Sequence, residues 1–489
     1  MKKLYLLTLL ILLSVNVYAF DASAEVELSY DIDAQNPFYQ TGIIDVGHTT
    51  DYIDFFWSFS VCNDDKYAPS HSDDLFFGYY FFLEEGGFTV DYEDLSLTLG
   101  RTTSSDDVDS PYSLFVSSKI IPALQADFNY DDGRFFFTSR WTELNRDSSL
   151  YTVDSTLSVV IEDEDEDEDE ESVSVTVKDA DSLDRGWQYN SYGVYIGDWR
   201  LGFQDSMVYT DSSFDPEYFF NPLPGFFKQY VRISSGKPWT SSSNANSIMG
   251  FFVEWTPEDV YSYGQLLIDD FNANAIFNPD SYQNPNKIAW SLGGRYDFDW
   301  GTLGFYHAGA TKYTFQSYGS SSNDEQYGYS FYPAVTYTAN GVLMPIELED
   351  NYIGYYNGEN NISLLADYEA TWFDIAVYSS LEFSISGDKS PANPWGEYNW
   401  YTDEGTLLLD SDPLEKKLVL TAGAGRTMDE LGLPSLMLSL ALEVGYIWNV
   451  LELVDTSVTD YTKIQYWSPS DENAAVFSVT LGGKYSIHY

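Results

Sequence analysis

The chain has 489 residues, with 77 acidic against 23 basic side chains and a formal net charge of −54 at pH 7. This charge argues against nucleic acid as a partner and against steering of anionic small ligands, because long-range repulsion disfavours both. Aromatic residues make up 18% of the chain, more than a soluble core of this size needs, and the single cysteine, Cys62, rules out an internal disulfide.

Residues 1–19 have the composition of a cleaved secretory signal. Lys2 and Lys3 precede an apolar run, and Val17 and Ala19 occupy the small-residue positions before a cut. The run of about fourteen residues is too short to span a bilayer, which takes about 20. We therefore expect a signal peptide at 1–19 and one domain at 20–489.

The remaining chain has the pattern of an all-β protein. Apolar and polar residues alternate in one stretch after another, and none keeps amphipathic-helix spacing over more than about two turns. Polar clusters rich in Gly, Asn, Asp, Ser and Pro separate these stretches and predict loops.

An acidic run, Glu162 to Glu171, lies between two apparent strands around residues 156–161 and 172–177. A run of this charge density does not pack and stays solvated, so we predict an exterior hairpin tip between two strands of the wall. The alternative is a weak sink for divalent cations, without the glycine and bidentate glutamate spacing of a calcium loop. Its candidate ligands are Glu162, Glu164, Glu166, Glu168 and Glu170.

A basic residue stands out on a strand near residue 200. Asp198 and Arg200 are two residues apart, on the face that we predict to lie opposite Tyr195, Trp199, Leu201 and Phe203. We expect both to point into a lumen, where Arg200 pairs with carboxylates and rigidifies the structure.

Four later stretches show the clearest alternation. Residues 288–305 and 362–383 each read as two strands joined by a tight turn, which is the pattern of a hairpin. Residues 436–448 and 477–489 place apolar side chains on one face only. Charged residues such as Glu443 occupy the opposite face, where a soluble sandwich would be apolar and a membrane barrel lines its lumen.

The pattern therefore predicts a transmembrane antiparallel β-barrel of about 18 strands, with short periplasmic turns and long extracellular loops. The chain provides about 26 residues per strand where the wall needs about 9 to 11, which leaves the rest for loops. We expect the last strand to close on the first. The aromatic end at Tyr489 resembles the signature read by the outer-membrane assembly machinery.

Catalytic motifs are not apparent. The four histidines are not at metal-ligand spacing, and neither G-x-S-x-G nor H-E-x-x-H occurs. Asp269 and Asp270 are adjacent on a strand and so point to opposite faces, which does not suit a general acid and base pair. We expect no enzymatic activity, no cofactor and no dedicated metal site.

Three segments in the middle of the chain carry a family resemblance. They are WRLGFQDSMVYTDSSFDPEYFFNPLPGFF, NSIMGFFVEWTPEDVYSYGQLLIDDF and KIAWSLGGRYDF. In this order they resemble the capsule-assembly outer-membrane proteins of the Wzi-like family, over about residues 97 to 300. The matching positions are Arg200, Asn221, Pro222, Trp255, Pro257, Asp269, Asp270 and Phe271.

Upstream of these segments, LSLTLGRTT with Arg101 and SLFVSS with Ser117 and Ser118 resemble two further strands of that family. TTSSDDVDS replaces the segment with tryptophan and glycine that the family usually has after the arginine. Residues 20–60 show no helical pattern of the kind that forms a periplasmic plug in some members.

The resemblance implies an 18-stranded barrel that assembles or attaches surface polysaccharide without catalysis, in the outer membrane of a Gram-negative-type bacterium. The remaining alternatives are a cation-preferring porin or substrate channel, and an adhesin or structural barrel. Expected partners are outer-membrane lipid and lipopolysaccharide, surface polysaccharide and the assembly machinery. Candidate ligand-binding residues are Arg101, Asp198, Arg200, Asn221, Asp269, Asp270, Trp395 and Trp400.

Overall fold

The computed structural model describes residues 21–32, 36–64, 78–145, 156–160, 172–176, 184–210, 212–234, 245–271, 285–316, 328–333, 335–339, 342–391, 405–428, 433–457 and 463–487. The predicted signal peptide, the acidic run, Trp395 and Trp400 lie outside these residues. No helix within them is long and apolar enough to cross a membrane.

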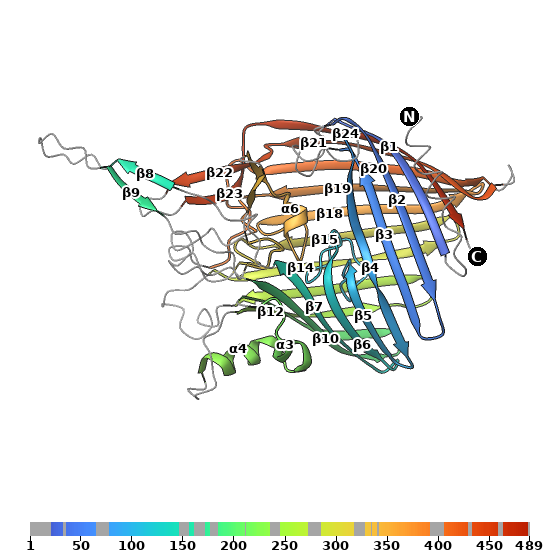
Figure 1. Ribbon diagram of the computed structural model, residues 1–489, viewed down its shortest axis with the longest axis horizontal. Helices are drawn as coiled ribbons and strands as arrows, with labels where there is room; N and C mark the ends of the chain where they lie inside the picture. The colour runs from blue at the N-terminus through green and yellow to red at the C-terminus, as the bar shows by residue number, and fades with distance from the viewer. Residues whose placement is uncertain are drawn as a thin grey trace, which may run out of the picture.

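The described residues form a closed antiparallel barrel of 18 strands, which confirms the predicted fold class (Figure 1). The wall strands are β1 (Asp21–Asp31), β2 (Phe38–Thr49), β3 (Ile53–Cys62), β4 (Tyr80–Tyr92), β5 (Leu95–Thr102), β6 (Ala123–Asp131), β7 (Phe135–Asn145), β10 (Arg185–Ile196), β11 (Trp199–Thr210), β12 (Ala245–Trp255), β13 (Val260–Asp270), β14 (Lys287–Phe298), β15 (Gly301–Ala310), β18 (Asn361–Trp372), β19 (Ile375–Ser386), β20 (Glu415–Met428), β21 (Leu433–Trp448) and β24 (Asn473–Ile487).

Further elements lie in the connections between wall strands. Two-stranded pairs are formed by β8 (Thr156–Val160) with β9 (Ser172–Thr176), by β16 (Thr336–Ala339) with β17 (Val342–Pro345), and by β22 (Leu451–Ser457) with β23 (Lys463–Pro469). The helices are α3 (Pro216–Phe220), α4 (Gly225–Ser234) and α6 (Leu348–Asn351).

The barrel closes where β24 pairs with β1, from Ala22 opposite Ile487 to Asp31 opposite Ser478. This pairing satisfies the backbone groups that two free sheet edges would otherwise expose. It also confirms that the last wall strand closes on the first.

Short and long connections lie at opposite ends of the barrel (Figure 1). The strand pairs β4–β5, β10–β11, β14–β15 and β18–β19 are each joined by two residues. In the last of these turns Phe373 and Asp374 both have positive φ, 51° and 62°, the conformation that matches the twist of the flanking strands. β1 begins and β24 ends at this short-turn end.

Apolar side chains cover the outward face of the wall. On β21 Leu438, Leu440 and Leu442 are 45%, 48% and 38% exposed. Near the short turns Trp199 stacks on Trp255 with 5.8 Å between ring centroids. An exposed apolar belt with aromatic residues at its edge is typical of barrels embedded in lipid.

Two sequence-based expectations about wall strands are wrong. β8 and β9 pair only with each other and project beyond the end that carries the long connections (Figure 1), so they form a separate hairpin and not part of the wall. Ser117 and Ser118 lie in the connection between β5 and β6, which enters the lumen and forms no strand.

The closure register gives a direct test. Ser29 lies opposite Thr480, and their hydroxyl oxygens are 3.1 Å apart. In a Cys62→Ser background, Ser29→Cys with Thr480→Cys should form a disulfide on mild oxidation, because directly opposite strand residues fulfil its geometry. Mass spectrometry of peptides would detect the link. The control is Ser29→Cys with Ser478→Cys, because Ser478 lies two residues along β24 from the position opposite Ser29. Preferential crosslinking of that pair would contradict the register.

Candidate functional site

The connection between β5 and β6, residues 103–122, folds into the lumen, and we call it the plug segment. Tyr112, Leu114 and Phe115 in it are fully buried. They pack in one hydrophobic cluster with lumen-facing side chains of the wall, including Trp187 and Phe252. The apolar run SLFV is therefore the core of a plug, since its burial comes from the barrel interior and not from sheet pairing.

Asp106 organises the plug segment from within. Its Oδ2 accepts hydrogen bonds from the backbone N–H groups of Phe115 and Val116 at 2.9 and 3.1 Å. Its Oδ1 accepts from the side-chain amides of Gln204 on β11 and Gln265 on β13 at 2.5 and 3.1 Å. The carboxylate thereby fixes the shape of the segment and ties it to two strands of the wall.

Burial of the Asp106 carboxyl raises its pKa above the ordinary value, and the neighbouring Asp107 adds to this effect. The hydrogen bonds from Gln265, Gln204 and Val116 lower the pKa in part. A buried carboxylate is expensive unless donors surround it, so these donors make the position tolerable for a charge.

Asp107 forms an ion pair with Arg200 of β11. Arg200 Nη1 also donates to the Asp107 backbone carbonyl at 2.8 Å and to Glu254 of β12 at 2.9 Å. The guanidinium lies 4.1 Å from the ring centroid of Phe136 on β7. Arg200 therefore joins the plug segment to the wall through Asp107, while Glu254 and Phe136 hold the guanidinium in place within the wall.

Further anchors lie around the lumen. Arg140 Nη1 on β7 donates to the Ser105 carbonyl at 2.7 Å, and Arg295 Nη1 on β14 lies 2.6 Å from Asp109 Oδ2. The Tyr112 hydroxyl donates to Glu382 on β19 at 2.9 Å. Because β12, β13, β14, β15 and β18 separate β11 from β19 in the wall, the segment bridges distant parts of the lumen.

The connection between β15 and β18 packs against the plug segment. The Tyr329 hydroxyl donates to the Phe115 carbonyl at 2.6 Å, and the Ser117 N–H donates to the Ile353 carbonyl at 2.6 Å. Arg185 of β10 is fully buried and donates to three carbonyls of this connection, those of Gly328, Ser330 and Phe331.

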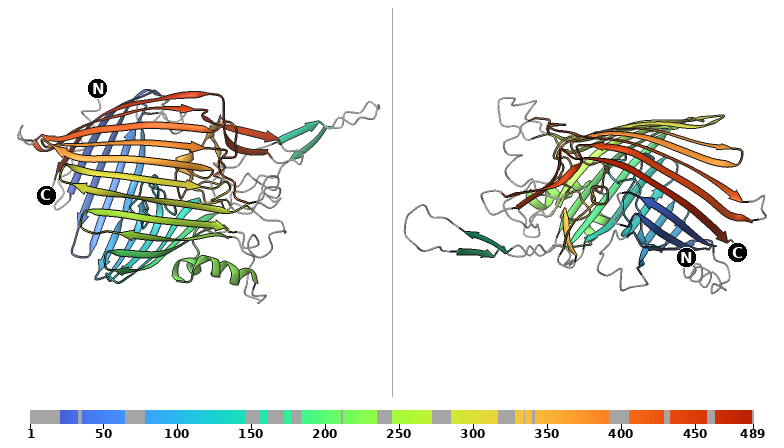
Figure 2. Two further views of the ribbon diagram at one scale, coloured as in Figure 1. Left: turned by 180° about the vertical axis from the view of Figure 1, so that it is seen from behind. Right: turned by 90° about the horizontal axis from the view of Figure 1, so that it is seen from above.

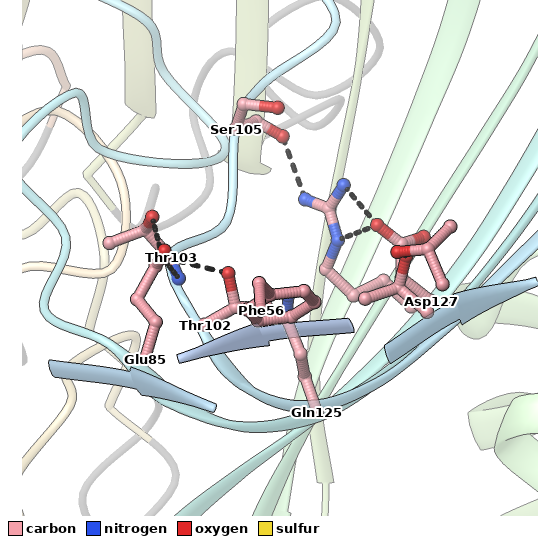
Figure 3. A pocket seen from close by; sticks show the side chains of 10 residues that line it. Phe56, Glu85, Thr102, Thr103, Ser105, Gln125 and Asp127 are labelled. Atoms are coloured by element: carbon pink, nitrogen blue, oxygen red, sulfur yellow. Dashed lines mark hydrogen bonds and ion pairs between the residues drawn. The ribbon is translucent and has the colours of Figure 1, made fainter. Parts of the chain in front are cut away.

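A polar pocket of about 270 Å³ lies beside the start of the plug segment (Figure 3). It has one aromatic ring, that of Phe56, among carboxylate, amide, guanidinium and hydroxyl groups. The Asp127 carboxylate in it forms an ion pair with Arg140 at 2.8 Å. The pocket lining is Phe56, Glu85, Thr89, Thr98, Thr102, Thr103, Ser105, Gln125, Asp127 and Arg140. Several of these groups bond one another, as Thr89 does with Thr98 and Glu85 with Thr102, so a hydroxyl-rich ligand would share or replace these bonds.

A second polar region lies where β1, β2 and β24 meet. Lys484 Nζ lies 3.2 Å from Glu25 and 3.9 Å from Asp45, whose side chain is 42% exposed. Glu27 follows on the same face of β1. Three carboxylates thus accompany one cation in this part of the lumen.

The predicted site residues separate in the structure. Arg200 is in the lumen network, but Asp198 is in the exposed turn before β11, where its carbonyl accepts a bond from the Thr256 N–H at 2.9 Å. Alternation does not extend into a turn, so Asp198 is not beside Arg200. Tyr195 also differs from the prediction, because it pairs directly with Arg200 and shares its face.

The other candidates also lie apart from Arg200. Arg101 Nε donates to the Leu83 carbonyl at 2.9 Å, and Asn221 caps the end of α3. Asp269 accepts a bond from the Phe315 N–H at 3.1 Å and lies 3.9 Å from Lys287, whereas Asp270 is the last residue of β13. Within the described residues no cluster of three His, Cys, Asp or Glu side chains could hold a metal ion.

Sequence comparison finds no matching family model and no curated protein with significant similarity. The fold is similar to Wzi, an outer-membrane protein of Escherichia coli involved in group 1 capsule assembly and described as a carbohydrate-binding β-barrel. The TM-score is 0.53 at 10% identity, over 99% of this chain and 88% of that chain. This likeness shows a shared fold alone.

Two outer-membrane proteins of Pseudomonas aeruginosa also match. OpdK has a TM-score of 0.44 at 9% identity over 96% of this chain and 98% of that chain. OccD3 has a TM-score of 0.44 at 8% identity over 96% and 92% of the two chains.

Asp106→Asn should loosen the plug segment without unfolding the wall. The amide of the variant places an N–H group against donors that bind a carboxylate oxygen in the wild type. This loss destabilises the docked plug segment by about 3 kcal/mol, so the population with an opened plug segment rises roughly 100-fold. Trypsin cleavage after Lys119, followed by mass spectrometry, should accelerate accordingly. Asp132→Asn, in an exposed short turn, is the control, and equal cleavage of both variants would contradict the role of Asp106.

Proposed function

We propose that this protein is an outer-membrane barrel that binds or anchors surface polysaccharide and catalyses no reaction. The observation that carries the proposal is the polar pocket beside the plug segment. Its hydroxyl, amide and carboxylate groups surround one phenyl ring, a combination that offers hydrogen bonds to sugar hydroxyls and an apolar face to sugar C–H groups. A chain end or branch that enters the lumen can reach these groups.

The plug segment supports a binding role over free diffusion. Ion pairs with Arg200 and Arg295 and the hydrogen bond to Glu382 hold it across the lumen. A segment anchored in this way narrows the path for solutes. The carbohydrate binding stated for Wzi, a barrel with the same fold, is consistent with the proposal.

A channel that prefers cations is the second candidate. It is favoured by the carboxylates around Lys484, because Glu25, Glu27 and Asp45 give that side of the lumen an excess of negative charge. A ring or cluster of carboxylates selects cations in water-filled pores.

Planar-bilayer recording distinguishes the two candidates. The polysaccharide-binding barrel should show little conductance, and Arg200→Ala should increase it, because removing the guanidinium leaves Asp107 and Glu254 without their partner, at a cost of about 3 kcal/mol or more. Arg134→Ala, in an exposed short turn, should behave like the wild type. Large and steady wild-type conductance with cation preference would favour the channel.

Glycan binding tests the pocket directly. Phe56→Ala should weaken binding of surface polysaccharide purified from the producing organism by about tenfold, which corresponds to about 1.4 kcal/mol. Isothermal titration in detergent measures the change. Phe59→Ala is the matched control, since Phe59 is on the same strand but on the outward face and 44% exposed. Equal binding by wild type and Phe56→Ala would overturn the assignment of the pocket.

A further inference from the structure

The outward face of the wall carries an unexpected polar patch. Ser139 on β7, Gln188 and Asn190 on β10, and Asp205 on β11 are each no more than 2% exposed. Strand alternation places them on the same face as the outward residues nearer the short turns, such as Ile196, which is 60% exposed. Groups of this kind facing lipid would each be costly.

The connection between β11 and β12 covers this patch. We call residues 212–234 the helical arm; it contains α3 and α4 and lies outside the barrel wall (Figures 1 and 2). The Phe219 carbonyl accepts a bond from Ser139 at 2.8 Å, and the Gly225 N–H donates to Asp205 at 2.7 Å. The arm thus supplies the partners that lipid cannot.

Two more contacts fix the arm along the wall. The Tyr192 hydroxyl, nearer the middle of β10, donates to the Pro222 carbonyl at 2.7 Å. Tyr218 is fully buried and packs with outward residues Met207 and Tyr209. The arm therefore folds back over the outside of the barrel. It continues the apolar belt near the end that carries the long connections.

Within residues 212–229 of the arm, the exposed residues are apolar except Glu217. Phe220, Leu223, Phe226 and Phe227 are 73%, 53%, 46% and 55% exposed. The cationic side chain between the wall and α4, Lys228, is turned inward, where its Nζ donates to the Tyr218 carbonyl at 2.9 Å. Phe251, an outward wall residue on the neighbouring β12, is 54% exposed, so aromatic surface extends from wall to arm.

We propose that the helical arm inserts this aromatic face into the outer leaflet of the membrane, at the boundary between headgroups and acyl chains. The arm covers the polar patch of the wall and presents apolar residues to lipid in its place. It thereby extends the lipid contact of the barrel on one side. Burial of large apolar side chains in the acyl region is favourable, and amphipathic helices bind this boundary in the same way. The inference rests on the outer-membrane location proposed above.

Site-directed spin labelling tests the arm. In a Cys62→Ser background, Phe227→Cys carries a nitroxide in protein reconstituted in vesicles of phosphatidylcholine and lipopolysaccharide. Collisions with oxygen should exceed those with a water-soluble nickel chelate, as they should for Leu292→Cys, an outward wall residue that is 51% exposed. Asp132→Cys, in an exposed short turn, should show the reverse. A matching pattern at Phe226→Cys is also expected.

Each other result has a defined meaning. Preferential nickel access at Phe227→Cys, with Leu292→Cys still in lipid, would overturn lipid insertion of the arm and leave the barrel location intact. Low access of both reagents at Phe227→Cys would indicate a second copy or another protein on the arm, which also overturns the proposal. Nickel access at Leu292→Cys would instead refute the membrane location on which the inference rests.

Discussion

Two adjacent carboxylates, Asp106 and Asp107, determine how the lumen is filled. Asp106 accepts hydrogen bonds from five donors, three in its own segment and two in the wall, whereas Asp107 pairs with Arg200. The two carboxylates therefore have different structural roles. Asp106 sets the shape of the plug segment, and Asp107 fixes its position against β11. Without these contacts, residues 103–122 would be an ordinary long connection at the end of the barrel.

The wall and the plug depend on opposite uses of polarity. Outside, apolar strand faces meet lipid and need no partners. Inside, polar groups of the plug bond specific side chains such as Asp106 and Gln265, and Tyr112, Leu114 and Phe115 form a buried apolar core. The helical arm does the same on the outer face, where its backbone groups form hydrogen bonds with Ser139 and Asp205 of the wall. Polar wall residues are thus tolerated on either face where another segment covers them.

Strict alternation made the wall predictable. The hairpins β14–β15 and β18–β19 and the long strand β21 follow directly from a period of two, because one face of each meets an apolar environment. The lumen position of Arg200 followed from the same rule. The rule failed for Asp198 and Tyr195, since the two-residue turn before Trp199 interrupts the alternation.

The plug segment and the helical arm were beyond this rule. SLFV has the composition of a strand, but two of its partners, Gln265 and Tyr329, lie more than a hundred residues away in the chain. A usable signal was present in Asp106 and Asp107, whose adjacent charges do not fit an alternating wall strand. For the arm, the signal was the polar pair Gln188 and Asn190, which occupies the outward face where alternation calls for apolar residues. The composition of the polar pocket gave no local signal, because its ten lining residues come from β3 to β7 and the start of the plug segment.

Residues 103–122 are docked as part of the folded barrel, and amide hydrogen exchange tests this docking most directly. The N–H groups of Leu114, Phe115, Val116 and Ser117 all donate to specific acceptors: Gln265, Asp106, Asp106 and Ile353. In protein reconstituted in lipid, these four amides should exchange as slowly as those of neighbouring wall strands, because both report stable hydrogen bonds. Exchange at the rate of a solvated loop, with the wall still protected, would contradict the account.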